Sequence, residues 1–183
     1  MKAKKVRPRV LVIDSDVVAT ATGNENPRSM SCLLTLNTVL RVGHKVLLTP
    51  AIATEWNNRF PKFAGRWLVQ MKSRGSLVEV EDEPDTGIAG ALRKLPVHPD
   101  ILAIMLKDKH LLEAALLAHQ TVLSMDETAY YHFYAAAKAI SQIRPVMWAN
   151  PERAVDACVT WLISGARPDT NRRIGIRPRR GTV

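Results

Sequence analysis

The chain has 183 residues, 46% of them apolar, and a formal net charge of +9. This length corresponds most simply to one domain, which can bury roughly two thirds of its unfolded surface in a single core. With only two cysteines a disulfide framework is excluded, and no stretch approaches the roughly 20 apolar residues of a membrane span. We therefore expect a soluble cytoplasmic protein with no membrane partner.

The basic charge is concentrated at the two ends of the chain. Residues 1–9 carry five lysines and arginines and no acid, and residues 167–183 carry six arginines against Asp169. Such ends suit a polyanion, because each cation placed on a phosphate releases condensed counterions, and they equally suit solubilising disorder. We divide the chain into a basic segment (1–8), an α/β domain (9–166) and a basic, disordered tail (167–183).

Strands and helices alternate along the predicted domain. A strand at 9–14 leads to a helix over about 29–42, and a second strand at 45–49 ends at Pro50. There Thr49 can cap a helix that Pro50 begins and that runs to about Lys72. An edge strand at 77–81 follows, and then a helical segment at 85–106 that two prolines interrupt.

The second half continues the alternation. Asp108 precedes an apolar helical face, and strands are predicted at 121–125 and 144–149, each followed by a helix. Continuous aliphatic strands are typical of a sheet covered on both faces, and alternating strands and helices imply right-handed crossovers. The sequence predicts an α/β fold with an open parallel sheet flanked by helices.

Four acids fall where predicted strands end or the adjoining helices begin. Asp14 ends the first strand, Asp126 follows the strand at 121–125, Glu55 lies early in the helix after Pro50, and Asp108 opens its helix. Singly, each acid fits a turn, a helix cap or a solvated face. Together at one sheet edge they repel one another unless a cation neutralises them.

Oxygen ligands alone favour a hard cation, Mg²⁺ or Mn²⁺. The five histidines show no zinc-ligand spacing such as HExxH, so a zinc hydrolase is disfavoured.

With these pieces in place, the chain resembles the PIN domain family of metal-dependent ribonucleases. The matching stretches are VLVIDSD, TPAIATEW, KDKHLLEAAL and VLSMDE, in the family's order over about residues 8–150. The resemblance implies a three-layer α/β/α domain that acts as an Mg²⁺- or Mn²⁺-dependent endoribonuclease. It makes Asp14, Glu55, Asp108 and Asp126 the catalytic residues and metal ligands, and puts Ser124 in the Ser/Thr place of the family's Ser/Thr-x-Asp signature.

Three further residues are expected to support these acids. Ser15 and Asp16 are expected to shape the turn after the first strand, and a nuclease should tolerate the loss of Asp16. Glu127 is the acid that can stand for the second acid that the family often carries after Asp126. The basic residues expected to contact RNA are Arg59, Lys62, Arg66, Arg172, Arg173, Arg177, Arg179 and Arg180. The resemblance leaves toxin-antitoxin and RNA-processing roles open, and with them an antitoxin-like partner and a homodimer.

Two alternatives remain open. DSDVV, from Asp14, is similar to the DxDxT/V motif of haloacid-dehalogenase-like phosphatases, with Thr49 as a second motif. In that reading Asp14 attacks phosphorus and Asp16 is the general acid, but Glu55 and Asp108 have no role. The other alternative is an RNA-binding or partner-binding module without catalysis. In it, some of the rings over 130–134 stack on bases, although at least half of them are expected to pack in the core.

Overall fold

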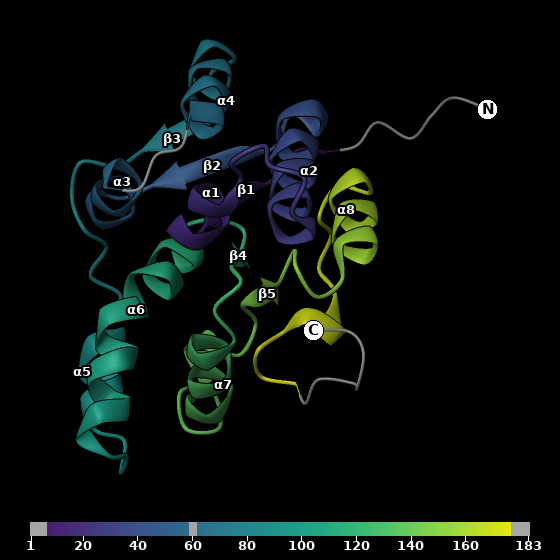
Figure 1. Cartoon of the computed structure of the whole chain (residues 1–183). Coiled ribbons are helices and arrows are strands. Elements are labelled where there is room, and N and C mark those ends of the chain that lie inside the picture. Colours follow the sequence, from purple (N-terminus) through teal and green to yellow (C-terminus); the bar gives the residue numbers. More distant parts are fainter. Residues whose placement is uncertain (1–6, 59–61, 177–183) are drawn as a thin grey trace.

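A five-stranded, all-parallel sheet lies at the centre of the computed structural model, which describes residues 7–58 and 62–176. The strand order is β3-β2-β1-β4-β5 (Figure 1). Leu11, Val12 and Ile13 are fully buried, as expected for a central strand covered on both faces. The predicted fold class is confirmed. The strands are β1 (Val10–Ile13), β2 (Lys45–Leu48), β3 (Leu77–Glu79), β4 (Thr121–Leu123) and β5 (Met147–Ala149).

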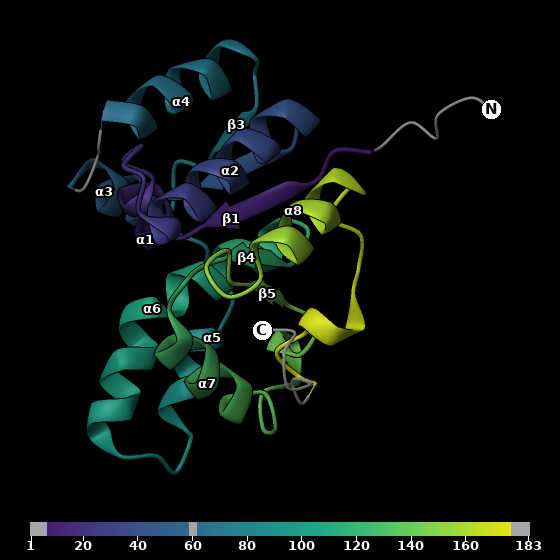
Figure 2. The ribbon, with the colours of Figure 1, turned by 45° about the vertical axis from the view of Figure 1, so that its right-hand side comes forward.

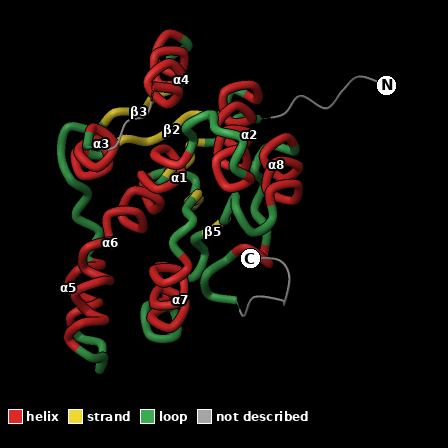
Figure 3. The backbone as a smooth tube through the Cα atoms, in the orientation of Figure 1, coloured by secondary structure: helices red, strands yellow, loops and turns green. Residues whose placement is uncertain are grey.

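Helices cover both faces of the sheet and complete the three layers. In Figure 2, α2, α4 and α8 lie on one side of the strands and α5, α6 and α7 on the other, and Figure 3 shows the strands enclosed by helices. None of the helices in the described part of the chain is both long enough and apolar enough to cross a membrane. The helices are α1 (Ser15–Thr20), α2 (Pro27–Val42), α3 (Pro50–Asn57), α4 (Lys62–Ser73), α5 (Ile88–Arg93), α6 (Pro99–Leu117), α7 (Glu127–Ala136) and α8 (Val155–Ile163), with short 3₁₀ turns η1 (Ser141–Ile143) and η2 (Thr170–Arg172).

Local sequence explains where the helices near the site begin and end. The Thr49 hydroxyl accepts a hydrogen bond from the Ile52 amide, and Pro50 is the first residue of α3, as predicted. Helix α2 ends at Gly43, whose φ of 81° is a conformation that glycine adopts without strain. With these two boundaries, the carboxyl end of β2 comes directly before α3, so that α3 starts at the edge of the sheet where the acids lie.

The chain reverses its winding direction between β1 and β4. It passes outward from β1 through β2 to β3, then returns across the sheet through α5 and α6 to β4, which pairs with β1 on its other side. The register sets Ile13 beside Leu123, and the Asp14 amide donates to the Leu123 carbonyl at 2.9 Å. The carboxyl ends of β1 and β4 therefore lie side by side, while the connections that follow them lead to opposite halves of the sheet. Open α/β sheets form ligand crevices at such a point.

Two predicted helices differ from the observed ones. The helix expected over 50–72 is two helices, because α3 ends at Asn57 and α4 begins at Lys62; Pro61 lies outside the described residues. The prediction that Asp108 opens a helix is wrong, since α6 begins at Pro99 with His98 as its N-cap. Proline is well tolerated in the first helical turn, so Pro99 starts a helix rather than breaking one.

The prediction of a disordered tail from residue 167 is wrong for residues 167–176. Arg173 bridges to Met147 in antiparallel fashion, and the Ile174 amide donates to the Val146 carbonyl at 2.9 Å. The side chain of Ile174 is fully buried. This segment therefore covers the outer edge of β5. Residues 177–183 and 1–6 lie outside the described part of the chain.

Candidate active site

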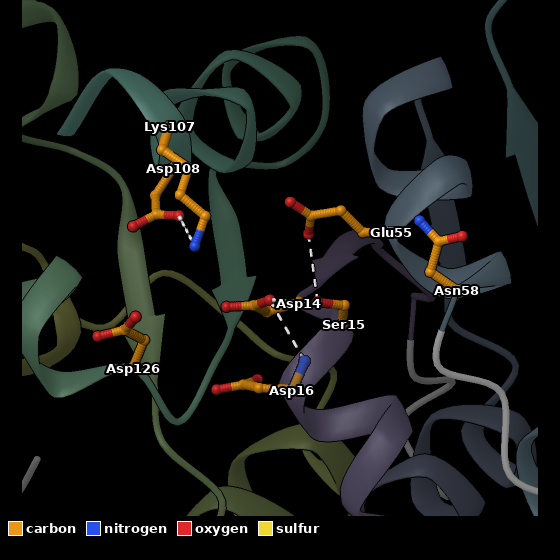
Figure 4. Close-up of a pocket in the computed structure, with 8 residues that line it drawn as sticks. All are labelled: Asp14, Ser15, Asp16, Glu55, Asn58, Lys107, Asp108 and Asp126. Atoms are coloured by element: carbon orange, nitrogen blue, oxygen red, sulfur yellow. Dashed lines mark hydrogen bonds and ion pairs between the residues drawn. The ribbon is translucent and has the colours of Figure 1, made fainter. Parts of the chain in front are cut away.

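A pocket of about 250 Å³ at the carboxyl edge of the sheet collects acids from four separate segments (Figure 4). All four predicted acids line it, although they lie up to 112 positions apart in the sequence, from Asp14 to Asp126. The junction of β1 and α1 contributes three residues, α3 with its C-terminal cap contributes two, α6 contributes two, and the loop after β4 contributes one. The lining residues are Asp14, Ser15, Asp16, Glu55, Asn58, Lys107, Asp108 and Asp126.

Asp14 is the most deeply buried of these acids, with 8% of its surface exposed. Ser124 donates a hydrogen bond to one Asp14 oxygen at 2.7 Å and accepts one from the Asp126 amide at 3.0 Å. Burial raises the pKa of Asp14, while the hydrogen bond from Ser124 opposes that rise. Ser124 thus links Asp14 by hydrogen bonds to the segment that carries Asp126.

Asp16 is a fifth carboxylate of the pocket rather than a turn residue. It lies in the first turn of α1, which begins at Ser15, where the sequence predicted a turn. One of its oxygens accepts from the Met125 amide at 2.9 Å, and the other is buried without a hydrogen-bond partner. Burial, with the neighbouring Asp14 carboxylate as the next cause, raises the pKa of Asp16 from 3.8 to about 8. A nearby cation would therefore stabilise the charged form of this carboxylate.

Glu55 is held between a serine and a histidine. The Ser15 hydroxyl lies 3.2 Å from a Glu55 oxygen and 3.3 Å from Asp14, so its single proton can serve either acid. The same Glu55 oxygen lies 3.5 Å from Nε2 of His110. Nδ1 of His110 lies 3.0 Å from the Lys107 carbonyl, and since a carbonyl only accepts, Nδ1 carries a proton. Helix α6 thus places the His110 ring beside Glu55, without a hydrogen bond between them.

Asp108 and Asp126 face the pocket from two other elements. Burial raises the pKa of Asp108, and the ammonium of Lys107, 3.8 Å away, opposes the rise. In Figure 4 the Lys107 side chain extends from α6 into the space among the carboxylates. Asp126 caps α7 with one oxygen, which accepts from the Ala129 amide at 2.8 Å.

Glu127 does not join the pocket. One of its oxygens accepts from the Asn150 amide group at 2.6 Å, and the other pairs with Arg153 at 3.3 Å. The first turn of α7 directs this side chain toward the loop after β5. The acid that was expected to supplement Asp126 is therefore engaged elsewhere, and Asp16 is the additional carboxylate in the pocket.

The basic residues predicted to contact RNA are not gathered around the pocket in the described part of the chain. Arg172 pairs with Asp169 at 3.3 Å and stacks 4.7 Å from the centre of the Trp161 ring, which fastens the C-terminal segment to α8. Arg173 bridges to β5, beside residues that precede that strand, at the edge opposite the acids. Arg66 is exposed on α4, and no described residue of α4 lines the pocket. The side chains of Arg59, Lys62, Arg177, Arg179 and Arg180 lie outside the described residues.

The side chains that line the pocket are of the type that binds hard divalent cations. The acids offer only carboxylate oxygens, and a buried oxygen of Asp16 has no hydrogen-bond partner. Within residues 7–58 and 62–176, however, no three His, Cys, Asp or Glu side chains already form a group that could hold a metal ion. The match to Mg²⁺ or Mn²⁺ is therefore one of ligand type and charge alone, not of a formed coordination site.

Sequence reasoning missed Asn58, Lys107 and His110. Their signal was helical spacing: Asn58 follows Glu55 by three positions, and His110 follows Lys107 by three, so each pair shares a helix face. His110 is buried, with 6% of its surface exposed.

Comparisons with known proteins add no relative. No protein-family model matches the chain, and no curated protein or solved structure is similar to it.

Proposed function

We propose that this chain is a PIN-like endoribonuclease that depends on Mg²⁺ or Mn²⁺. One observation carries the proposal: five carboxylates from four segments share one pocket at the carboxyl ends of β1 and β4. Burying these carboxylates together costs stability: burial first, and the neighbouring acids second, raise the pKa values of Asp14, Asp16 and Asp108. A cation bound among these carboxylates would offset this cost, which would explain why the pocket contains so many acids.

Asp14, Asp16, Asp108, Asp126 and Glu55 are the residues that would hold the ion. When bound, Mg²⁺ or Mn²⁺ supplies positive charge that makes a water a better nucleophile and offsets charge that develops on the phosphate. Ser124 keeps Asp14 oriented, and the Ser15 hydroxyl lies within hydrogen-bond reach of Glu55. These contacts preorganise the carboxylates, so the reaction needs no side-chain nucleophile.

The phosphatase alternative has less support. Its second motif requires Thr49 near the reacting phosphate, but Thr49 is fully buried, caps α3 and does not line the pocket. That alternative also leaves Glu55 and Asp108, which do line the pocket, without a role. The non-catalytic alternative needs exposed rings beside Asp126. Tyr130 and Phe133 instead pack in the core against Trp148, which leaves Tyr131 and Tyr134 for stacking.

Cleavage of single-stranded RNA by the purified full-length chain tests the proposal. We expect shorter RNAs with Mg²⁺ or Mn²⁺, none with EDTA, and a loss of roughly a hundredfold or more for Asp14→Asn and Asp126→Asn. Asp82→Asn, which removes an exposed acid outside the pocket, is the matched control and should cut normally.

The products separate the alternatives. Because Asp16 lines the pocket, its loss no longer distinguishes a nuclease from a phosphatase. Release of inorganic phosphate from small monoesters, without RNA cleavage, would favour the phosphatase. RNA binding that survives Asp14→Asn, without cleavage by any form, would favour the non-catalytic module.

A further inference from the structure

A second hollow, of about 530 Å³, adjoins the carboxylate pocket between α3 and α6. Glu55 and Lys107 line both spaces, so the two are contiguous. Pro50, Thr54 and Leu106 contribute to its wall, and the volume lies within the roughly 300–1,000 Å³ of small-ligand sites. The hollow therefore has room for one nucleotide beside the acids.

Lys107, at the boundary, is a cation whose ion pair with Asp108 is long. Its side chain is 78% exposed and its ammonium lies 3.8 Å from Asp108, the next residue along the helix. Successive residues do not face each other on a helix, so this pair is weak. Lys109 differs, because its ammonium pairs with Glu113 one turn later at 2.6 Å. Lys107 is thus free to leave Asp108 for another anion.

His110 gives the hollow a fixed polar wall. It is 6% exposed, its Nδ1 is anchored on the Lys107 carbonyl, and its Nε2 makes no hydrogen bond within the described residues. The ring also lies next to Glu55, so the wall of the hollow and the acid pocket share one rigid element. The nearest acid to Nε2 is Glu55 at 3.5 Å, beyond a good hydrogen bond, so a ligand that hydrogen-bonds Nε2 from the hollow would offset the cost of burying it.

We infer that this hollow binds the nucleotide next to the scissile phosphate, and that Lys107 contacts the phosphate between the two spaces. The inference rests on the proposed ribonuclease function and names the subsite that function requires. The hollow is less acidic than the pocket, because against Glu55 and Glu83, which accepts from the Ala51 amide, its lining carries Lys107 and Lys109. Of the eight residues that line the pocket, Lys107 alone is cationic, and it marks the side facing the hollow.

Two substitutions change the hollow without removing a carboxylate. Thr54→Trp fills it from an exposed position on α3, and Lys107→Gln removes the charge at its boundary. Val69→Trp, at a 68% exposed position on α4, is the control for bulk. Lys45→Gln, at the exposed start of β2 on the opposite edge of the sheet, is the control for charge. Mn²⁺ binding followed by electron paramagnetic resonance, without RNA, checks that the carboxylate pocket of each variant is intact.

RNA affinity is measured by fluorescence anisotropy with a short labelled single strand, with Ca²⁺ in place of Mg²⁺, over a range of salt concentrations. We expect Thr54→Trp to weaken binding by roughly tenfold. Lys107→Gln should weaken binding and reduce the slope of log affinity against log salt by about 0.7, the value of one phosphate contact on a single strand. Both controls should match the unchanged chain.

The outcomes separate this inference from the proposed function. If the unchanged chain cleaves RNA while both variants bind like their controls, the inference is overturned and the ribonuclease function stands. If the unchanged chain does not bind RNA at all, both are overturned. The subsite is supported if Lys107→Gln reduces the slope of log affinity against log salt and Thr54→Trp binds RNA more weakly than its control.

Discussion

Replacing Asp16 with asparagine should stabilise the cation-free protein. Asp16 and Asp14 are buried together, and burial with this repulsion raises the pKa of Asp16 from 3.8 to about 8. The folded chain then keeps a proton that the unfolded chain releases, so stability falls as the pH rises from about 4 to about 8. Asparagine keeps an oxygen that can accept from the Met125 amide and removes the charge.

The magnitude follows from the shift. The value pH 7 lies about three pH units above the pKa of an unfolded aspartate. At roughly 1.4 kcal/mol per unit, the cost of ionising Asp16 in the folded state is about 4 kcal/mol as an upper limit. Screening by water at the pocket mouth and the coupling to Asp14 reduce this to about 2 kcal/mol. For a chain of this size, that is a rise of roughly 4–8 °C in Tm.

Thermal melts in EDTA between pH 5 and pH 8 measure the effect, with Asp82→Asn as the exposed control. Asp16→Asn should show the higher Tm at pH 7 and a weaker decline toward pH 8. Added Mn²⁺ should then raise the Tm of the unchanged chain more than that of the variant, because a ligand stabilises the state that binds it. A Tm at pH 7 equal to or below that of the unchanged chain would refute the reasoning from charge crowding.

Three further outcomes are expected. Ser124→Ala removes the 2.7 Å hydrogen bond to Asp14 and should weaken Mn²⁺ binding roughly 10–100-fold; unchanged affinity would show that this contact does not orient the acid. Burial lowers the pKa of His44 from 6.5, and its neutral Nδ1 accepts from the Arg9 amide at 3.0 Å. Stability should therefore fall as the pH drops below about 6.5, and His44→Gln should lose this decline in urea unfolding at pH 7.5 and 5.5; an equal decline in both forms would contradict it. Ile174→Ala should cost about 2–4 kcal/mol in urea unfolding, and an unchanged midpoint would mean that the C-terminal segment does not dock on β5.

Much of the fold was predictable because its signals are local. The aliphatic runs at β1, β2 and β4 mark strands buried on both faces, and Thr49 with Pro50 marks the start of α3. The errors arose where one residue type carries two meanings. Proline at 99 was read as a helix break and is a helix start, and Asp108 was read as a cap although it lies within α6.

The candidate site was predicted in part, for a reason of geometry. Parallel strands bring their carboxyl ends to one edge, so an acid placed just after such a strand can be assigned from the sequence, as with Asp14 and Asp126. The directions of side chains on helices depend on where each helix packs. Glu127 therefore turned away toward Asn150 and Arg153, which no local pattern indicates.

The sequence by itself determined the alternation of strands and helices, the class of the sheet and the four acids that meet in the pocket, because strand burial and helix caps depend on neighbouring residues. Only the tertiary structure decided the strand order, the inclusion of Asp16 and Lys107, and the contact of His110 with Glu55. These features depend on how α1, α3 and α6 pack over the ends of β1 and β4. Such packing is set by contacts between residues far apart in the chain, which no single stretch encodes.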